Sequence, residues 1–172
     1  MSIKIRSSKT ISHKGGIKVA IHSLAGMGKT MLAASCPKPV VILTERTGAD
    51  CLTEANIKDV WSVDGKLKKG IVTDIPIIEA YTTSDIEEAI TFCRNSDDYE
   101  TIIFDSVSEM SKLRLKEALP NHKNAMQAYG VMAAHVDQLI REMRDDPKNW
   151  VFLFHSERED VYNDEGEASS TM

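Results

Sequence analysis

Residues 17–30 read IKVAIHSLAGMGKT, and this stretch decides the fold. Its first six residues, 17–22, are mostly apolar and include β-branched side chains, which predicts a buried β-strand. A glycine-rich turn follows, and the run 31–36, MLAASC, favours a helix that ends before Pro37. A strand, a glycine-rich turn and a helix in this order are typical of the start of an α/β unit.

The turn at residues 23–30 matches the pattern G-x-x-x-x-G-K-[ST] of a phosphate-binding loop, except that Ser23 replaces the first glycine. Glycines let backbone N–H groups point at phosphate oxygens beside a helix N-terminus. Lys29 is expected to contact the β- and γ-phosphates, and Thr30 to hold Mg²⁺. A bare GKT also arises by chance in a turn that binds nothing, but the flanking strand and helix favour a nucleotide. The residues expected to contact it are Ser23, Ala25, Gly26, Met27, Gly28, Lys29, Thr30 and Met31.

Four more apolar runs alternate with helical patterns. The runs are residues 40–43, 77–81, 101–105 and 150–154. This alternation predicts one α/β domain over residues 1–172, with a mainly parallel sheet and helices on both faces. Residues 46–76 are expected to add a short helix or a hairpin. Residues 161–168 are expected to form a hairpin with a turn at 163–166.

Three helices follow from local patterns. Ser84 and Glu87 have the spacing of a capping box, which predicts the start of a helix that buries Ile86 and Cys93 on one face. A second helix is expected over residues 107–119. The strongest helical pattern is 125–144, because its apolar residues recur at spacings of three and four. That apolar face consists of Met126, Tyr129, Met132, Val136, Leu139 or Ile140, and Met143.

Polar residues at strand ends are the candidate site, since parallel sheets bind ligands at the carboxyl ends of their strands. Asp105 ends TIIFD and is the expected Mg²⁺ partner of Thr30, although an Asp after a strand is usually a helix cap, and Asp105 or Ser106 could cap the helix that follows. Glu45 follows VVILT and is placed to activate water. Glu109 is the other acid considered for that role, and is more in keeping with a solvent-facing position. His155 ends WVFLFH. It could sense a γ-phosphate, or it could be a histidine at a strand end whose hydrogen bonds are satisfied within the fold.

The charge is unevenly distributed. The chain of 172 residues has a net charge of −5, yet its first 44 residues contain seven Lys and Arg and no acidic residue. This hints at an anionic ligand near the N-terminal half, although ordinary surface charges account for the charge distribution equally well. Four basic residues that precede the phosphate loop and its strand are the first candidates for DNA contact, ahead of the lysines at 66–69. They are Lys4, Arg6, Lys9 and Lys14.

The composition is that of an ordinary globular protein, with 42% hydrophobic and 27% charged residues. No apolar run approaches the roughly 20 residues of a membrane helix. The first residues lack the apolar core of a signal peptide. Cys36, Cys51 and Cys93 include no CxxC pair, which argues against a disulfide framework or a zinc site. A cytoplasmic location is therefore expected.

In this order, the segments KVAIHSLAGMGKT, VVILTE, IPIIEAYTTSDIEEA, YETIIFDSVSEM, QAYGVM and NWVFLFHSERED resemble the RecA-like P-loop ATPases of phages, more narrowly those of the single-strand annealing type. The resemblance implies a RecA-like core that binds ATP and Mg²⁺, with the strand 150–154 between the P-loop strand and the strand 101–105. It makes Lys29 a phosphate ligand, and Thr30 and Asp105 the Mg²⁺ ligands.

The same resemblance makes Glu45 the water-activating residue and His155 the polar sensor. It implies that Arg158 could reach a neighbour's nucleotide, although Arg158 could equally be a surface residue. Proteins of this type are expected to bind single-stranded DNA, to promote annealing or recombination, and to form homo-oligomers with ATP near subunit contacts.

Two other functions remain open at the level of sequence. One is a small-molecule P-loop kinase, which usually has an arginine-rich lid; the best arginine pair here, Arg141 and Arg144, lies on a helical pattern. The other is a scaffold that binds nucleotide without hydrolysing it.

Overall fold

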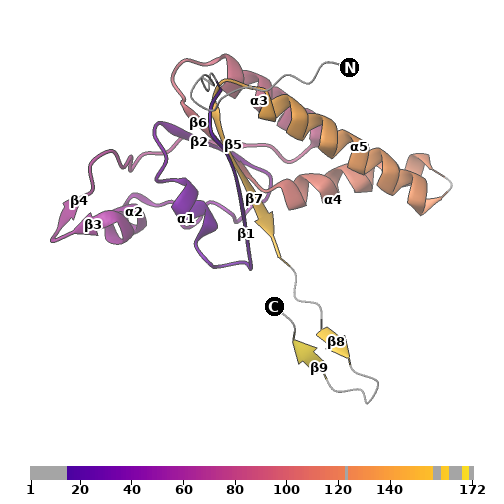
Figure 1. The fold of residues 1–172 in the computed structure, drawn as a ribbon, viewed down its shortest axis with the longest axis horizontal. Coiled ribbons are helices and arrows are strands. Elements are labelled where there is room, and N and C mark those ends of the chain that lie inside the picture. The colour runs from indigo at the N-terminus through magenta and orange to yellow at the C-terminus, as the bar shows by residue number, and fades with distance from the viewer. Residues whose placement is uncertain (1–14, 123, 157–159, 163–167, 171–172) are drawn as a thin grey trace, which may run out of the picture.

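A computed structural model describes residues 15–122, 124–156, 160–162 and 168–170. Its centre is a parallel five-stranded sheet in the order β1-β7-β6-β2-β5 (Figure 1). The strands are β1 (Lys18–Ser23), β2 (Pro39–Leu43), β5 (Ile77–Glu79), β6 (Thr101–Asp105) and β7 (Asn149–His155). The predicted α/β class with a parallel sheet is confirmed. The order also places β7 between the P-loop strand β1 and β6, as the RecA-like resemblance implied.

Helices cover both faces of the sheet, as predicted. One face packs against α1 (Lys29–Ala33) and α2 (Glu54–Trp61). The other packs against α3 (Thr83–Asn95), α4 (Val107–Ala118) and α5 (Ala125–Arg144). Residues of each central strand alternate between the two cores, because successive side chains point to opposite faces. In β6, for example, Ile102 and Phe104 face the α3–α5 side, whereas Ile103 faces α1 and α2.

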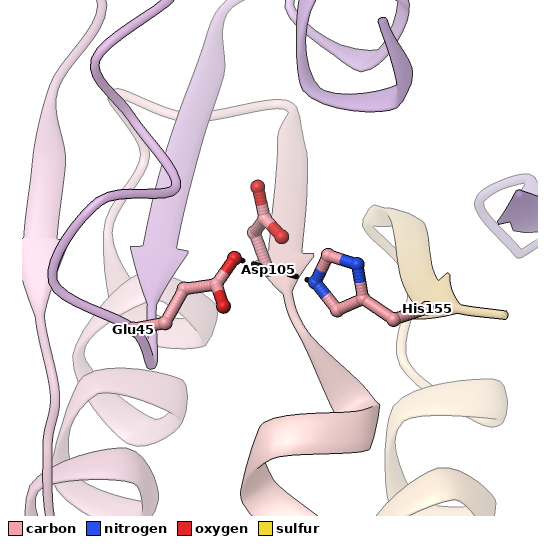
Figure 2. Close-up of side chains that lie close together, drawn as sticks. All are labelled: Glu45, Asp105 and His155. Atoms are coloured by element: carbon pink, nitrogen blue, oxygen red, sulfur yellow. Dashed lines mark ion pairs between the residues drawn. The ribbon is translucent and has the colours of Figure 1, made fainter. Parts of the chain in front are cut away.

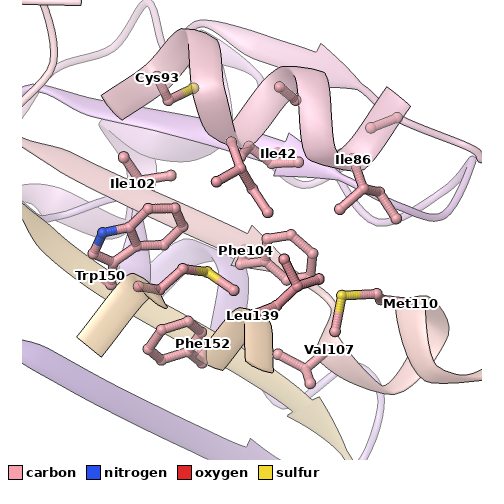
Figure 3. Close-up of a cluster of buried hydrophobic side chains, with 14 of the residues drawn as sticks. Ile42, Ile86, Cys93, Ile102, Phe104, Val107, Met110, Leu139, Trp150 and Phe152 are labelled. Carbon is pink, nitrogen blue, oxygen red and sulfur yellow. The ribbon is translucent and has the colours of Figure 1, made fainter. Parts of the chain in front are cut away.

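The larger core lies beneath α3, α4 and α5 (Figure 3). Trp150 of β7 is fully buried there and stacks on Phe152, with ring centroids 5.9 Å apart. Met110 of α4 and Met143 of α5 fill the space around them and are also fully buried. This core fixes β6 and β7 side by side, which places the ends of both strands at the same edge of the sheet.

The segment between β2 and β5 contains both of the alternatives expected for it. Helix α2 is followed by a hairpin of β3 (Ser62–Val63) and β4 (Lys66–Leu67). A 3₁₀ turn, η2 (Leu119–Asn121), joins α4 to α5, and β8 (Asp160–Tyr162) pairs with β9 (Ala168–Ser170) as the expected terminal hairpin. The expected turn at 163–166 and Arg158 lie outside the described residues. No helix among the described residues is long and apolar enough to cross a membrane.

Three local predictions were wrong. The capping box lies two residues earlier than predicted, because Thr82 and Asp85 make the reciprocal bonds and the helix begins at Thr83. The helix after the P-loop begins at Lys29 and ends at Ala33, before the predicted stop at Cys36. The strand predicted to be buried, β1, lies at the sheet edge, and Val19 is 41% exposed.

The apolar face predicted for residues 125–144 is only partly buried. Leu139 and Met143 pack into the core, but Met126 is 78% exposed and Tyr129 53% exposed. The reason is the length of α5, whose first turns extend with α4 beyond the sheet (Figure 1).

Candidate functional site

The phosphate loop lies at the carboxyl end of β1 and borders a cavity of about 530 Å³. This is the edge where a parallel sheet binds its ligands. Ala25, Gly26, Gly28, Lys29 and Thr30 of the loop line the cavity from one side. The opposite wall comes from residues after β2, from α4 and from the end of β7; it consists of Glu45, Thr47, Gly48, Asp50, Cys51, Glu109, Lys112 and His155.

The loop backbone depends on two glycines in the left-handed region. Gly26 has φ 76° and Gly28 has φ 81°. Ser23 replaces the first glycine of the usual pattern, but it is the last residue of β1 and its φ is not positive. The substitution therefore carries no left-handed strain. Helix α1 begins directly after Gly28, so the orphan N–H groups of its first turn face the loop.

Lys29 is buried, and its ammonium is held by three groups of the site. Nζ donates to the backbone oxygens of Ser23 and Leu24, each at 3.0 Å. It also lies 3.4 Å from Nδ1 of His155. These contacts fold the Lys29 side chain back over its own loop. A phosphate oxygen could replace the two carbonyl oxygens as the hydrogen-bond acceptor of Nζ.

Thr30 and Asp105 meet across the sheet. Thr30 Oγ1 donates to Asp105 Oδ2 over 2.7 Å, and Asp105 is only 1% exposed. A hydroxyl and a carboxylate are hard oxygen donors of the kind that Mg²⁺ prefers, so this pair fits the ion. Burial and the nearby Glu45 carboxylate raise the pKa of Asp105 above its usual value, although the Thr30 hydrogen bond works in the opposite direction.

Glu45 and His155 approach each other from the ends of β2 and β7 (Figure 2). Glu45 Oε1 lies 3.3 Å from Nε2 of His155. The two atoms are close enough for an ion pair, but they do not form a hydrogen bond. Nε2 of His155 is buried and has no hydrogen-bond partner in the described part of the chain. Donor atoms of Glu45, Asp105 and His155 all lie within 4.8 Å of one another, so this trio could also contact a metal ion.

A set of hydroxyl residues that the sequence analysis did not single out supports these groups. The Thr44 hydroxyl accepts from the backbone N–H of Ser106 at 2.8 Å, which fixes the chain just after Asp105. Ser108 Oγ accepts the backbone N–H of His155 at 3.0 Å and so ties α4 to the end of β7. Thr44 could have been found as a hydroxyl residue next to the strand-end acid Glu45. Ser106, expected as a possible helix cap, does cap α4 by accepting the backbone N–H of Glu109 at 3.2 Å. No local pattern pointed to Ser108.

The structure thus brings together the acids and the histidine expected from their strand ends, together with Lys29 and Thr30. Three expected nucleotide contacts do not line the cavity: Ser23, Met27 and Met31. Met27 is 71% exposed, whereas Met31 faces a neighbouring cavity. Asp105 lies behind Thr30. Glu109, expected to face solvent, instead lines the cavity, and its Oε2 lies 3.7 Å from Nζ of Lys112.

A comparison with family models assigns most of the chain to one family. The family model described as an AAA domain matches residues 15–172, which spans the phosphate loop, β6 and the end of β7. A comparison with curated proteins finds no match. The matched family is one of P-loop ATPases, which bind nucleotide and usually Mg²⁺. The chain belongs to the AAA domain family.

Proposed function

We propose that this protein binds ATP with Mg²⁺ at the phosphate loop and hydrolyses it. The observation that carries the proposal is that Lys29, Thr30 and Glu45 line one cavity, with the buried Asp105 hydrogen-bonded to Thr30 behind its wall. A phosphate-binding lysine, a magnesium pair and an acid for water are the parts that phosphoryl transfer to water needs.

Each residue has a separate task in this mechanism. The loop N–H groups and Lys29 bind phosphate oxygens. Thr30 and Asp105 would hold Mg²⁺, which would neutralise charge on the phosphates. Glu45 accepts a hydrogen bond from the attacking water and takes its proton at a carboxylate oxygen. His155 contacts both Glu45 and Lys29, so it holds the water-activating acid in place relative to the phosphate loop.

The direct test measures two properties of the same samples: thermal stabilisation by Mg-ATP, and phosphate release. The wild type should be stabilised by Mg-ATP and should release phosphate. Lys29→Ala should lose both, because the phosphates lose their buried positive partner. Lys116→Ala removes an exposed lysine of α4 and serves as the matched control. A Lys29→Ala protein that still hydrolyses ATP would contradict the proposal.

Two other functions predict different results. A non-hydrolysing scaffold would be stabilised by ATP without releasing phosphate. A small-molecule kinase would transfer phosphate to a nucleoside monophosphate. The kinase is disfavoured because Arg141 and Arg144, the best lid candidates, are exposed on the last turn of α5 and pair with Asp137 and Asp145. A screen of nucleoside monophosphates that gives robust turnover would reverse this preference.

We further propose that single-stranded DNA is the partner and that the protein acts as a homo-oligomer in phage recombination or annealing. Support comes from the motif order and from the acid-free first 44 residues. Lys4, Arg6, Lys9 and Lys14 lie outside the described residues. Changing these four to Ala should weaken binding of a labelled oligonucleotide in a salt series. Light scattering with Mg-ATP and the oligonucleotide would report assembly. Absence of binding at low salt would contradict the DNA role.

A further inference from the structure

Strand β5 forms the edge of the central sheet opposite β1. It pairs with β2 on one side, and among the described residues no strand pairs with its other side. An edge strand presents unpaired backbone N–H and C=O groups to any extended chain that lies beside it. The outer side of β5 is therefore a place where one further strand could join the sheet.

A cavity lies against β5 on each face of the sheet. The first, of about 610 Å³, has the apolar side chains of Leu43, Leu52 and Ile77 in its wall, together with several polar residues. The second, of about 330 Å³, lies between β5 and α3 and is bordered by Ile78 and Phe92. Successive side chains of a strand point to opposite faces, so a strand added outside β5 would send its side chains alternately into the two cavities.

The two cavities differ in charge. Asp85 and Glu88 of α3 border the second cavity, both are exposed, and no described residue that lines this cavity is basic. Phe92, which is 55% exposed, adds apolar surface beside these acids. The first cavity contains charges of both signs, Arg46 and Asp50 among them. The β5 edge therefore suits a short extended peptide with apolar side chains on one face and basic side chains on the other.

The chain itself contains a peptide of this kind. Residues 3–6 read IKIR and lie outside the described residues. In an extended conformation Ile3 and Ile5 share one face, and Lys4 and Arg6 share the other. The segment precedes β1, which is the sheet edge farthest from β5. A segment that starts at one edge of a molecule meets the opposite edge most directly in a neighbouring copy.

We infer that residues 3–6 of one copy add a strand to β5 of a second copy. The inference rests on the proposed homo-oligomer and names the surfaces that join its copies. The two isoleucines enter the cavity beside Ile77, and the two basic residues lie against Asp85 and Glu88 in the other cavity. Main-chain hydrogen bonds supply affinity, and the alternate cavities fix the register. Because the two surfaces differ, the contact is head-to-tail, and copies add one after another into a ring or a filament.

The test is light scattering of the full chain without DNA, over a range of concentrations, with and without Mg-ATP. The wild type should form species whose mass grows with concentration. Lys4→Glu and Glu88→Lys should each raise the concentration needed for assembly by about 10-fold, because like charges then face each other across the contact. The double variant Lys4→Glu/Glu88→Lys should recover part of that loss, which a misfolded chain would not do.

Two charge reversals serve as matched controls. Glu87→Lys changes the neighbouring acid of α3, whose side chain is 55% exposed and borders a different cavity. Lys9→Glu changes a basic residue of the same N-terminal segment outside the pairing residues. Both controls should assemble as the wild type does. A synthetic peptide of residues 1–8 should disperse wild-type assemblies, and the same peptide with Ile3→Glu and Ile5→Glu should not.

The outcomes separate this inference from the proposed function. Assembly that Glu87→Lys weakens as much as Glu88→Lys, or that the peptide does not disperse, would overturn the pairing with β5 and leave the homo-oligomer standing. A wild type that stays monomeric at every concentration would overturn both. A monomer that Ile5→Glu destabilises in melting curves would place the segment on β5 of its own chain and overturn pairing between copies. Phosphate release from the same samples decides the proposed ATP hydrolysis independently.

Discussion

Nε2 of His155 lies 3.3 Å from Oε1 of Glu45, and the other nitrogen of the same ring lies 3.4 Å from Nζ of Lys29. One imidazole therefore joins the residue proposed to bind phosphate to the residue proposed to activate water. Lys29 follows β1, Glu45 follows β2 and His155 ends β7, so the contact spans three parts of the sheet. If Lys29 moves when phosphate binds, the imidazole of His155 would move with it and shift the position of Glu45.

Glu45→Gln should slow ATP hydrolysis by about 10²–10⁴-fold, the usual contribution of a general base, while ATP still binds. Phosphate release and nucleotide titration on one sample would measure both. Glu79→Gln, at the exposed end of the neighbouring strand β5, is the control. A larger loss with Glu109→Gln than with Glu45→Gln would move the water-activating role to α4.

His155→Ala should reduce kcat by about 10²-fold with a smaller change in KM, because misplacing a reacting group costs that much in rate. His155→Gln should recover part of the loss, since its amide can still contact both neighbours. His135→Ala is the control, because His135 lies on α5 near Glu87 and outside the phosphate cavity. If KM rises and kcat is unchanged, His155 contributes to binding and does not position Glu45.

Asp105→Asn should abolish the Mg²⁺-dependent part of nucleotide binding and yet leave the free protein as stable as the wild type or more stable. Burial raises the pKa of Asp105, so its ionised form is disfavoured in the folded chain. The ionised Asp105 destabilises the fold fully at pH values above its raised pKa in the folded chain. The destabilisation disappears as the pH falls below the pKa of Asp105 in the unfolded chain. The stability gain of Asp105→Asn should therefore shrink on acidification in melting curves at several pH values. A stability gain of Asp105→Asn that grows at low pH would contradict the raised pKa of Asp105.

Gly28→Ala should destabilise the protein by about 1–2 kcal/mol and weaken nucleotide binding, because a residue with a Cβ is strained at φ 81°. The effect is one of backbone conformation, since an added Cβ would meet no atom within 4 Å. Gly130→Ala is the matched control: Gly130 is equally open but lies inside α5, where alanine should stabilise by about 0.5–1 kcal/mol. Denaturant melts measure both. A stable Gly28→Ala protein would show that the loop conformation tolerates a side chain.

The sequence by itself determined the phosphate loop, the five strands and their parallel arrangement. Each depends on neighbouring residues: a glycine-rich turn between strand and helix, and apolar runs of strand length separated by helices. The acids and the histidine were identifiable for the same reason, since each directly follows an apolar run. The position of β1 was wrongly judged, because an apolar run does not reveal whether a strand has one neighbour or two.

The tertiary structure decided which strand ends meet. Strand order depends on how each crossover helix packs, and that packing joins residues far apart in the chain. It places β7 between β1 and β6, an order that the RecA-like resemblance implied but no local residue pattern shows, and so brings His155 to Lys29 and Glu45. The contact of Ser108 with His155 also arises at this level, because the two residues lie 47 positions apart and no local pattern joins them.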